Sequence, residues 1–431
     1  MSRASNALKT FRSLNCKDLE RRLRVTDKAS CSLHSTIRHT LLCSRVMGLL
    51  PLCGLMSPSS EELRFTFRSL YTIYYLITLF GQILMFVMTC CWLSQNGISL
   101  PNVTNSVFYS SSLISSLILM NIGRFWPKLI KKAEVIEATL PPFTGNVNLW
   151  CNITMVFTLL AALVEHLLSV FYGLTVAYSC DPKDLWETFF RFNMPWIFDY
   201  TPYTLWKGIL SEMFNLQSTF IWSYNDLLLM IISIYLTEHF TVHNELLKKA
   251  VTQDNFSCAE FRTQYLKIVR LVRLINGQIG IYILTSFGIN LYWICTQLFY
   301  SLKKTHTGHF IALLVFYFYL TNIHAIAEHT FYFVFSFSFL LLRTLLVLLL
   351  AARVHSASVV PLVVLYNVPS SKFNTEVERF IAQINNIKVA LSGLDFFYVT
   401  RKMILTVSIL IAVLITLRDV HYFRQGIINV A

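Results

Sequence analysis

Hydrophobic residues in this chain gather in runs long enough to cross a membrane. A spanning helix needs about 20 mostly apolar residues. The segments that satisfy this requirement well are 70–93, 104–123, 150–178, 209–238, 277–301 and 329–352. One more run, 403–416, is too short to span comfortably. The pattern predicts an all-α integral membrane protein, a seven-transmembrane helical bundle whose last span is short.

Composition agrees with this fold class. Of the 431 residues, 55% are hydrophobic and 14% are charged, whereas a soluble domain has about 25% charged residues. The net charge of +13 could suggest nucleic-acid binding. We reject that interpretation, because Lys and Arg are sorted by membrane side and do not cluster on one soluble face.

The basic residues set the orientation through the positive-inside rule. If the N-terminus is cytoplasmic, the inner segments 1–68, 123–149, 239–276 and 353–402 together hold 28 Lys and Arg. The outer segments 94–105, 179–207 and 301–308 hold 5. We therefore predict a cytoplasmic N-terminus. This orientation is opposite to that of a G-protein-coupled receptor, whose characteristic short motifs are also missing here.

A long stretch, 209–276, contains neither Gly nor Pro. A helix over 209–252 would be about 65 Å long, roughly twice the hydrocarbon thickness. The returning segment has a helical apolar pattern at Phe261, Tyr265, Ile268, Val272 and Leu274. We expect long helices that project into the cytoplasm and pack on each other there. A solvated basic loop is the alternative.

The predicted organisation follows from these spans. It comprises a cytoplasmic N-terminal segment (1–68), spans 1–4 (69–238), a cytoplasmic helical segment (239–276), spans 5–6 (277–352), a further cytoplasmic segment (353–402) and the last span with its tail (403–431). Spans 5 and 6 are separated by an unusual stretch at 304–329 with its own apolar run. An eighth span there would place 353–402 outside, against the charge rule, so we expect a re-entrant, interfacial or spurious insertion.

Polar residues within spans are costly and therefore mark candidate sites. Span 4 has five at spacings of 3, 4, 3 and 4, which place them on one helical face: Glu212, Asn215, Thr219, Trp222 and Asp226. Other spans add Trp293 and Gln297, Glu165 and His166, and Tyr109. Carboxylates, amides and aromatic rings of this kind suit a small ligand that carries hydroxyl groups. Interhelical hydrogen bonding is the alternative role for each residue, and for Asp226, which lies deeper, a structural or gating role is favoured.

The sequence favours no enzyme, metal or cofactor. His239 and His243 are four residues apart but lack the intervening acid of a zinc-protease helix, and no phosphate-binding Gly loop is present. One glycosylation sequon, at Asn102, falls in the first outer loop and is a candidate for modification.

The C-terminal part of the chain has a specific signature. From Arg343 it includes Arg343-Thr344, Val368-Pro369-Ser370 and Val389-Ala390-Leu391-Ser392-Gly393, followed by a Phe pair and Val399-Thr400-Arg401. This block resembles insect gustatory receptors of the sugar-sensing group. The segments Met194–Met230 and Leu63–Ile77 are similar to the same family.

This resemblance implies a sugar-gated, non-selective cation channel subunit in the plasma membrane of a sensory neuron. It implies a homo- or hetero-tetramer of gustatory receptors, surrounded by membrane lipids, with cations passing through a pore lined by the last helix. On that helix the pore or gating positions would be Ile409, Val413 and Thr416. Small sugars would bind in the outer half of each helical bundle, with spans 1–4 (69–238) as the ligand-binding bundle. The segments 239–276 and 353–402 would form a cytoplasmic anchor that holds the subunits together.

The end of the chain departs from the family pattern. Family members usually end in Thr-Tyr, five mostly apolar residues and Gln-Phe, whereas here only Thr416 matches and Arg418 and Asp419 follow. Two charges within the membrane would cost about 2.5–3.5 kcal/mol each. A non-conducting or regulatory isoform or co-receptor is therefore an alternative function, and a sugar transporter is a second.

Overall fold

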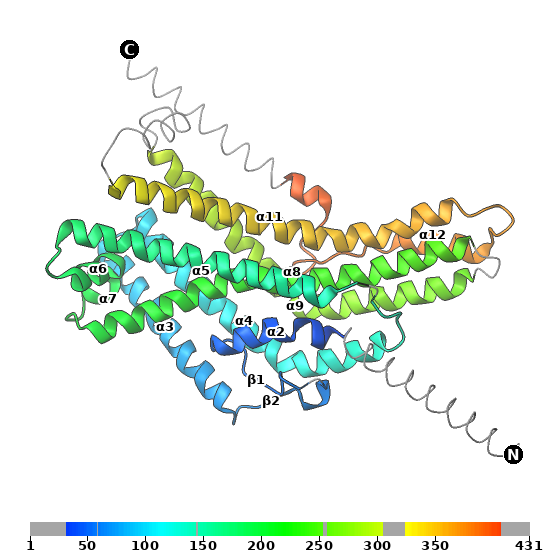
Figure 1. Cartoon of the computed structure of the whole chain (residues 1–431), viewed down its shortest axis with the longest axis horizontal. Helices are drawn as coiled ribbons and strands as arrows, with labels where there is room; N and C mark the ends of the chain where they lie inside the picture. Colours follow the sequence, from blue (N-terminus) through cyan, green and yellow to red (C-terminus); the bar gives the residue numbers. More distant parts are fainter. Residues whose placement is uncertain (1–31, 58, 144, 253–256, 305–323, 407–431) are drawn as a thin grey trace, which may run out of the picture.

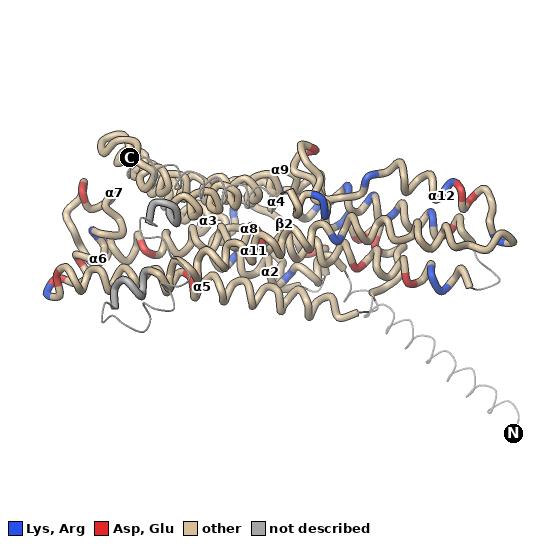
Figure 2. The backbone as a smooth tube through the Cα atoms, turned by 90° about the horizontal axis from the view of Figure 1, so that it is seen from above, with Lys and Arg blue, Asp and Glu red and all other residues tan. Residues whose placement is uncertain are grey.

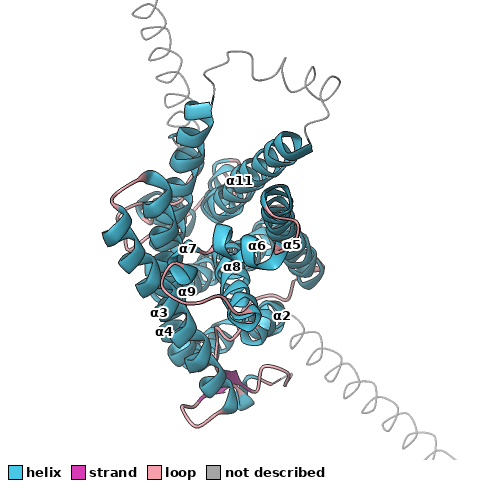
Figure 3. Ribbon diagram, turned by 90° about the vertical axis from the view of Figure 1, so that its left-hand side faces the viewer, coloured by secondary structure: helices cyan, strands magenta, loops and turns pink. Residues whose placement is uncertain are grey.

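The computed structural model describes residues 32–406 except 58, 144, 253–256 and 305–323. Its long helices run roughly side by side and form one elongated bundle (Figures 1 and 3). Six of them are long and apolar enough to cross a membrane. They are α3 (Leu70–Asn96), α4 (Leu100–Glu137), α5 (Val147–Cys180), α8 (Leu205–Val251), α9 (Cys258–Lys304) and α11 (His324–Tyr366).

These helices confirm the six strong spans predicted from the hydrophobic pattern. Two other predictions fall largely outside the described residues: the short last span at 403–416, and most of the unusual stretch at 304–329. Within that stretch, α9 continues to Lys304 and α11 already begins at His324.

Polar caps and a glycine fix where the first two spans begin and end. Ser69 accepts a hydrogen bond from the backbone N–H of Tyr71 and so caps α3, and Ser99 caps α4 in the same way. Between them, Gly97 has a φ of 76°, a backbone conformation that ends α3 and that side chains other than glycine seldom adopt. The result is a tight helical hairpin.

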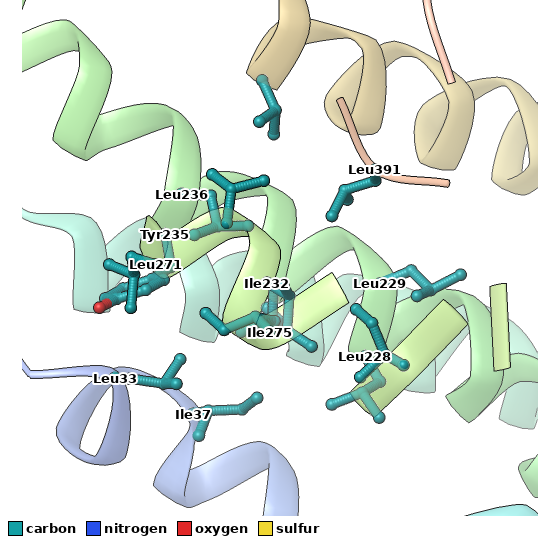
Figure 4. Close-up of a cluster of buried hydrophobic side chains, with 14 of the residues drawn as sticks. Leu33, Ile37, Leu228, Leu229, Ile232, Tyr235, Leu236, Leu271, Ile275 and Leu391 are labelled. Carbon is teal, nitrogen blue, oxygen red and sulfur yellow. The ribbon is translucent and has the colours of Figure 1, made fainter. Parts of the chain in front are cut away.

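The helix α8 is the central element of the fold. It is one continuous helix of 47 residues, which confirms the long helix predicted from the absence of Gly and Pro. Polar side chains do not interrupt its burial, because α5, α9, α11 and the short α2 all pack around it. Figure 4 shows the main core along it, where Leu228, Ile232 and Leu236 of α8 meet Leu33 and Ile275 from α2 and α9.

The returning segment after α8 is also helical and packed, so the solvated-loop alternative is wrong. In α9, Tyr265, Ile268 and Val272 are buried, and Phe261 and Leu274 pack against the same core. The amphipathic helix α12 (Thr375–Asn386) covers this end of the bundle through Val377, Phe380 and Ile384. In Figure 2, Lys and Arg are frequent at this end.

The N-terminal segment contributes to the core, which the sequence pattern did not predict. The helix α2 (Leu33–Val46) packs against α4, α5 and α8. It is followed by β1 (Leu52–Cys53), the 3₁₀ turn η1 (Ser60–Glu62) and β2 (Arg64–Phe65), and the two strands pair antiparallel. The amide of Gln217 in α8 donates to the Met47 carbonyl at 2.7 Å. A backbone carbonyl at the C-terminal end of α2 thus has a hydrogen-bond partner from α8.

The long connection between α5 and α8 folds into two short helices, α6 (Leu185–Asn193) and α7 (Pro195–Phe198). Phe189, Phe190, Trp196 and Phe198 are buried there in a second hydrophobic cluster. The buried aromatic side chains exclude a fully solvated loop, while Trp186 remains 54% exposed.

Candidate functional site

The part of the α8 polar face nearest the N-terminal end of the helix connects three helices. Glu212 pairs with His166 of α5, with 3.2 Å between His166 Nε2 and Glu212 Oε1. Asn215 donates its amide to the same carboxylate oxygen at 3.4 Å, and its own Oδ1 accepts the Tyr109 hydroxyl of α4 at 3.4 Å. Four residues selected from the sequence on three different spans are therefore brought into one hydrogen-bonded group.

Thr219 is tied to its own helix. Its hydroxyl donates to the carbonyl of Asn215 at 3.2 Å, a common arrangement for threonine inside a helix. The side chain lies on the predicted face of α8, but this bond occupies its donor. The Thr219 oxygen remains available only as an acceptor.

Two tryptophans form the aromatic part of the site. Trp222 of α8 and Trp293 of α9 have ring centroids 5.2 Å apart, and the Trp222 indole N–H donates to Asn290 Oδ1 at 3.1 Å. Trp222 is nearly buried, whereas Trp293 is only partly so. The less enclosed ring, Trp293, presents the larger apolar surface to an incoming molecule.

A third group links α5, α9 and α11 through Ser336. The Ser336 hydroxyl donates to Glu165 Oε1 at 2.6 Å, and Gln297 donates its amide to Ser336 Oγ at 3.3 Å. Three polar atoms of this region have no hydrogen-bond partner in the described part of the chain: Glu165 Oε2, Gln297 Oε1 and Trp293 Nε1. Buried polar atoms are rarely left unpaired. Two free acceptors and one free donor match the dual capacity of a hydroxyl group.

Further along α8, Asp226 forms an ion pair of which the sequence analysis identified only one member. Asp226 was selected, but its partner, Arg343 of α11, was noted only as part of the C-terminal signature. Arg343 Nε is 2.8 Å from Asp226 Oδ2, and each side chain is 1% exposed. An isolated arginine in an apolar span needs a carboxylate partner, and this signal could have identified the pair.

Further contacts complete this buried centre. Asp226 Oδ1 accepts the Ser286 hydroxyl at 2.6 Å and the Asn290 amide at 2.8 Å. The Arg343 guanidinium lies 4.3 Å from the Trp222 ring centroid, close enough for a cation–π interaction. The same Asn290 and Trp222 belong to the aromatic part of the site. The ion pair and the predicted ligand face are therefore in direct contact.

The remaining selected residues lie elsewhere. Asn102 is in the first turn of α4, and its amide donates to the Gly97 carbonyl at 2.9 Å. Glycosylation would require this amide to leave that bond. The pore positions Ile409, Val413 and Thr416 lie outside the described residues. Among the residues that the structure describes, no group of three His, Cys, Asp or Glu is arranged to hold a metal ion.

The fold is similar to that of an insect olfactory receptor. OR5 from Machilis hrabei superposes with a TM-score of 0.58 and 14% sequence identity, covering 89% of this chain and 96% of that one. Its complex with eugenol gives 0.59, with 97% of that chain covered. At this identity the likeness concerns the fold alone, which is an all-α, multi-pass membrane fold.

Sequence comparison identifies nearer relatives in Drosophila melanogaster. The gustatory receptor for sugar taste 64f is 29% identical over 385 residues, which are 88% of this chain and 78% of that receptor. The gustatory receptor 5a for trehalose is 29% identical over 384 residues, 88% of this chain and 82% of the relative. The family described as "Trehalose receptor" matches residues 19–327 and 320–417. The chain therefore belongs to the trehalose receptor family, a family of receptors and not of enzymes.

Proposed function

We propose that this protein is a gustatory receptor subunit in which a sugar bound between α4, α5, α8 and α9 opens a non-selective cation channel in the plasma membrane of a sensory neuron. The single observation that best supports the proposal is the convergence of polar and aromatic residues from four spans inside an apolar bundle. Relatives named for sugar taste and for trehalose support the same ligand class.

The chemistry of these residues suits a polyol. The carboxylate of Glu212 and the unpaired oxygens of Glu165 and Gln297 can accept hydrogen bonds from hydroxyls. The Trp293 indole N–H is a free donor in the described part of the chain, and its ring can stack on the C–H face of a pyranose. A site that hydrogen-bonds hydroxyls discriminates strongly against analogues that lack them, because its polar groups then remain unpaired.

Gating would follow from differential affinity. A sugar shifts a closed–open equilibrium only by binding one of the two states more tightly. The bound sugar would contact α8 and α9, which continue as long helices to the end of the bundle covered by α12. We propose that this end is the cytoplasmic anchor of a tetramer and that the last helix lines the pore.

The test is whole-cell current from cells expressing the chain, recorded during a panel of mono- and disaccharides. We expect sugar-evoked current that Glu212→Gln and Trp293→Ala shift to higher sugar concentration. Exposed Trp186→Ala serves as a matched control outside the proposed site. Uptake of labelled sugar without current would instead indicate the transporter, and an unshifted response in both site variants would refute the proposed pocket.

A second candidate is a non-conducting or regulatory subunit. The observation that favours it is the tail: the family match ends at residue 417, where Leu417-Arg418-Asp419 departs from the family's ending. A version with the family's usual ending from residue 417 separates the two candidates. Current from both versions supports a channel, whereas current only from the repaired version assigns this chain a regulatory role.

A further inference from the structure

A group of cations without ion-pair partners among the described residues lies where α3 begins and in the second half of α4. We define the basic patch as Arg64, Arg68, Arg124, Lys128 and Lys131, all of which are exposed. The last three are spaced by four and three residues on α4 and therefore share one helical face. The first two precede the start of α3. Arg64 belongs to β2, and β2 packs against α4 (Figure 1).

A direct contact connects the two halves of the patch. The guanidinium carbon of Arg124 lies 5.8 Å from the ring centroid of Phe67, and Phe67 is the residue before Arg68. Phe67 is itself 61% exposed. The loop before α3 and the second half of α4 thus present their cations on adjoining surfaces.

These cations have no counter-charge of their own. None of the five forms an ion pair with another described residue. The nearby acids are fewer than the cations: Glu134 of α4, which accepts the Ser60 hydroxyl at 2.5 Å, is one of three. The other two, Glu61 and Glu62, belong to η1 and are exposed. Five positive charges against these acids leave a surface that attracts anions.

Large apolar side chains surround the same cations. Leu70, the first residue of α3, is 81% exposed, and Phe125, beside Arg124, is 44% exposed. Apolar side chains left open beside cations are typical of a membrane interface, where the former enter the acyl region and the latter stay among headgroups. A soluble anionic partner would give no reason for Leu70 to be uncovered.

We propose that the basic patch binds the phosphorylated headgroup of an anionic phospholipid, a phosphoinositide, in the cytoplasmic leaflet. Clusters of four to eight Lys and Arg immediately on the cytoplasmic side of a span are suited to such lipids. A headgroup with several phosphates satisfies neighbouring cations from β2 and α4 at once. The lipid would thereby link the loop before α3 to α4. The proposal is independent of sugar gating and requires only the predicted cytoplasmic N-terminus.

The test is the affinity of the purified full-length protein in neutral detergent for dioctanoyl phosphatidylinositol bisphosphate. We expect saturable binding that the triple variant Arg124→Gln/Lys128→Gln/Lys131→Gln weakens by roughly tenfold or more, given the contribution expected per cation. A charge-retaining triple, Arg124→Lys/Lys128→Arg/Lys131→Arg, should bind as the wild type does.

A matched control removes the same charge elsewhere. The triple Lys249→Gln/Arg270→Gln/Arg273→Gln neutralises exposed cations of α8 and α9 and should leave binding within about twofold of the wild type. Equal losses in the two neutralised triples, or no binding by the wild type, would overturn the proposal. Free inositol trisphosphate binding as tightly as the lipid would also overturn it, because the site would then recognise a soluble phosphate.

Discussion

Removing Arg343 should be one of the most damaging single changes that this fold can undergo. The substitution Arg343→Met keeps most of the volume but leaves Asp226 charged, with 1% of its side chain exposed. Breaking a buried ion pair in this way costs about 3–5 kcal/mol. Hydrogen bonds from Ser286 and Asn290 still support the carboxylate, so we expect a loss near the lower limit, about 3 kcal/mol.

The loss of the cation over the Trp222 ring adds to this cost, by about 0.5–2 kcal/mol for a desolvated pair. The double variant Asp226→Asn/Arg343→Met removes both charges and should regain at least about 2 kcal/mol relative to Arg343→Met alone, because a buried pair replaced as a whole is often nearly neutral. The difference in stability between the double variant and Arg343→Met tests the pairing of the two charges more directly than the stability of either variant alone.

The assay is a denaturant titration of the purified protein in mixed micelles, followed by tryptophan fluorescence, for the wild type, both single variants and the double variant. The four free energies of unfolding give the coupling energy between the two side chains. Strictly additive losses would refute the reasoning, since they would show that the charges do not depend on each other. A loss below about 1 kcal/mol for Arg343→Met would refute it as well.

Two further changes test the packing and the far end of the bundle. Gly81→Ala should destabilise the protein by about 1–3 kcal/mol in a thermal unfolding assay, because the added Cβ would lie 2.0 Å from the Phe214 ring. Gly277→Ala is the matched control, since its added Cβ would meet no described atom within 4 Å. Hydrogen bonds from Arg379, which has the larger effect, and from Arg262 lower the pKa of Glu376 below its ordinary value of 4.5. The stability that this carboxylate contributes should therefore be fully present above about pH 4.5 and disappear as the pH falls through its lowered pKa. Glu376→Gln should then be less stable than the wild type at pH 7 and equal to it in acid, and a difference that persisted in acid would contradict this origin.

The spans and the polar face of α8 could be predicted because both depend on periodicity alone. Glu212, Asn215 and Asp226 recur at helical spacing, so any helix over this segment aligns them. The partners of Glu212 and Asn215 could not be assigned in the same way, since pairing depends on how distant helices pack. His166 and Tyr109 were selected for their polarity, but only the fold shows that both reach the Glu212–Asn215 group.

The role of the N-terminal segment was missed for a different reason. Its apolar run is interrupted by Arg45 and Pro51, which counts against a span and gives no indication of a buried helix. In the structure Arg45 is tolerated because its guanidinium lies 4.5 Å from the Tyr71 ring centroid at the edge of the packed region. The buried face of α2 does repeat with helical spacing at Leu33, Ile37 and Leu41, but Thr36, Thr40 and Ser44 share that face and weaken the hydrophobic pattern.

The unbroken course of α8 has a consequence for how this sequence can change its length. Each residue added to a helix turns everything beyond it by about 100°. A single insertion between Asp226 and His243 would therefore swing one end of the helix away from its neighbours while the other end kept its contacts. Only additions close to whole multiples of the helical repeat, such as seven residues, would restore the phase. We expect insertions and deletions to be confined to the loops, and a small rotation of α8 at the end that carries Glu212 to reappear as the same rotation at its opposite end.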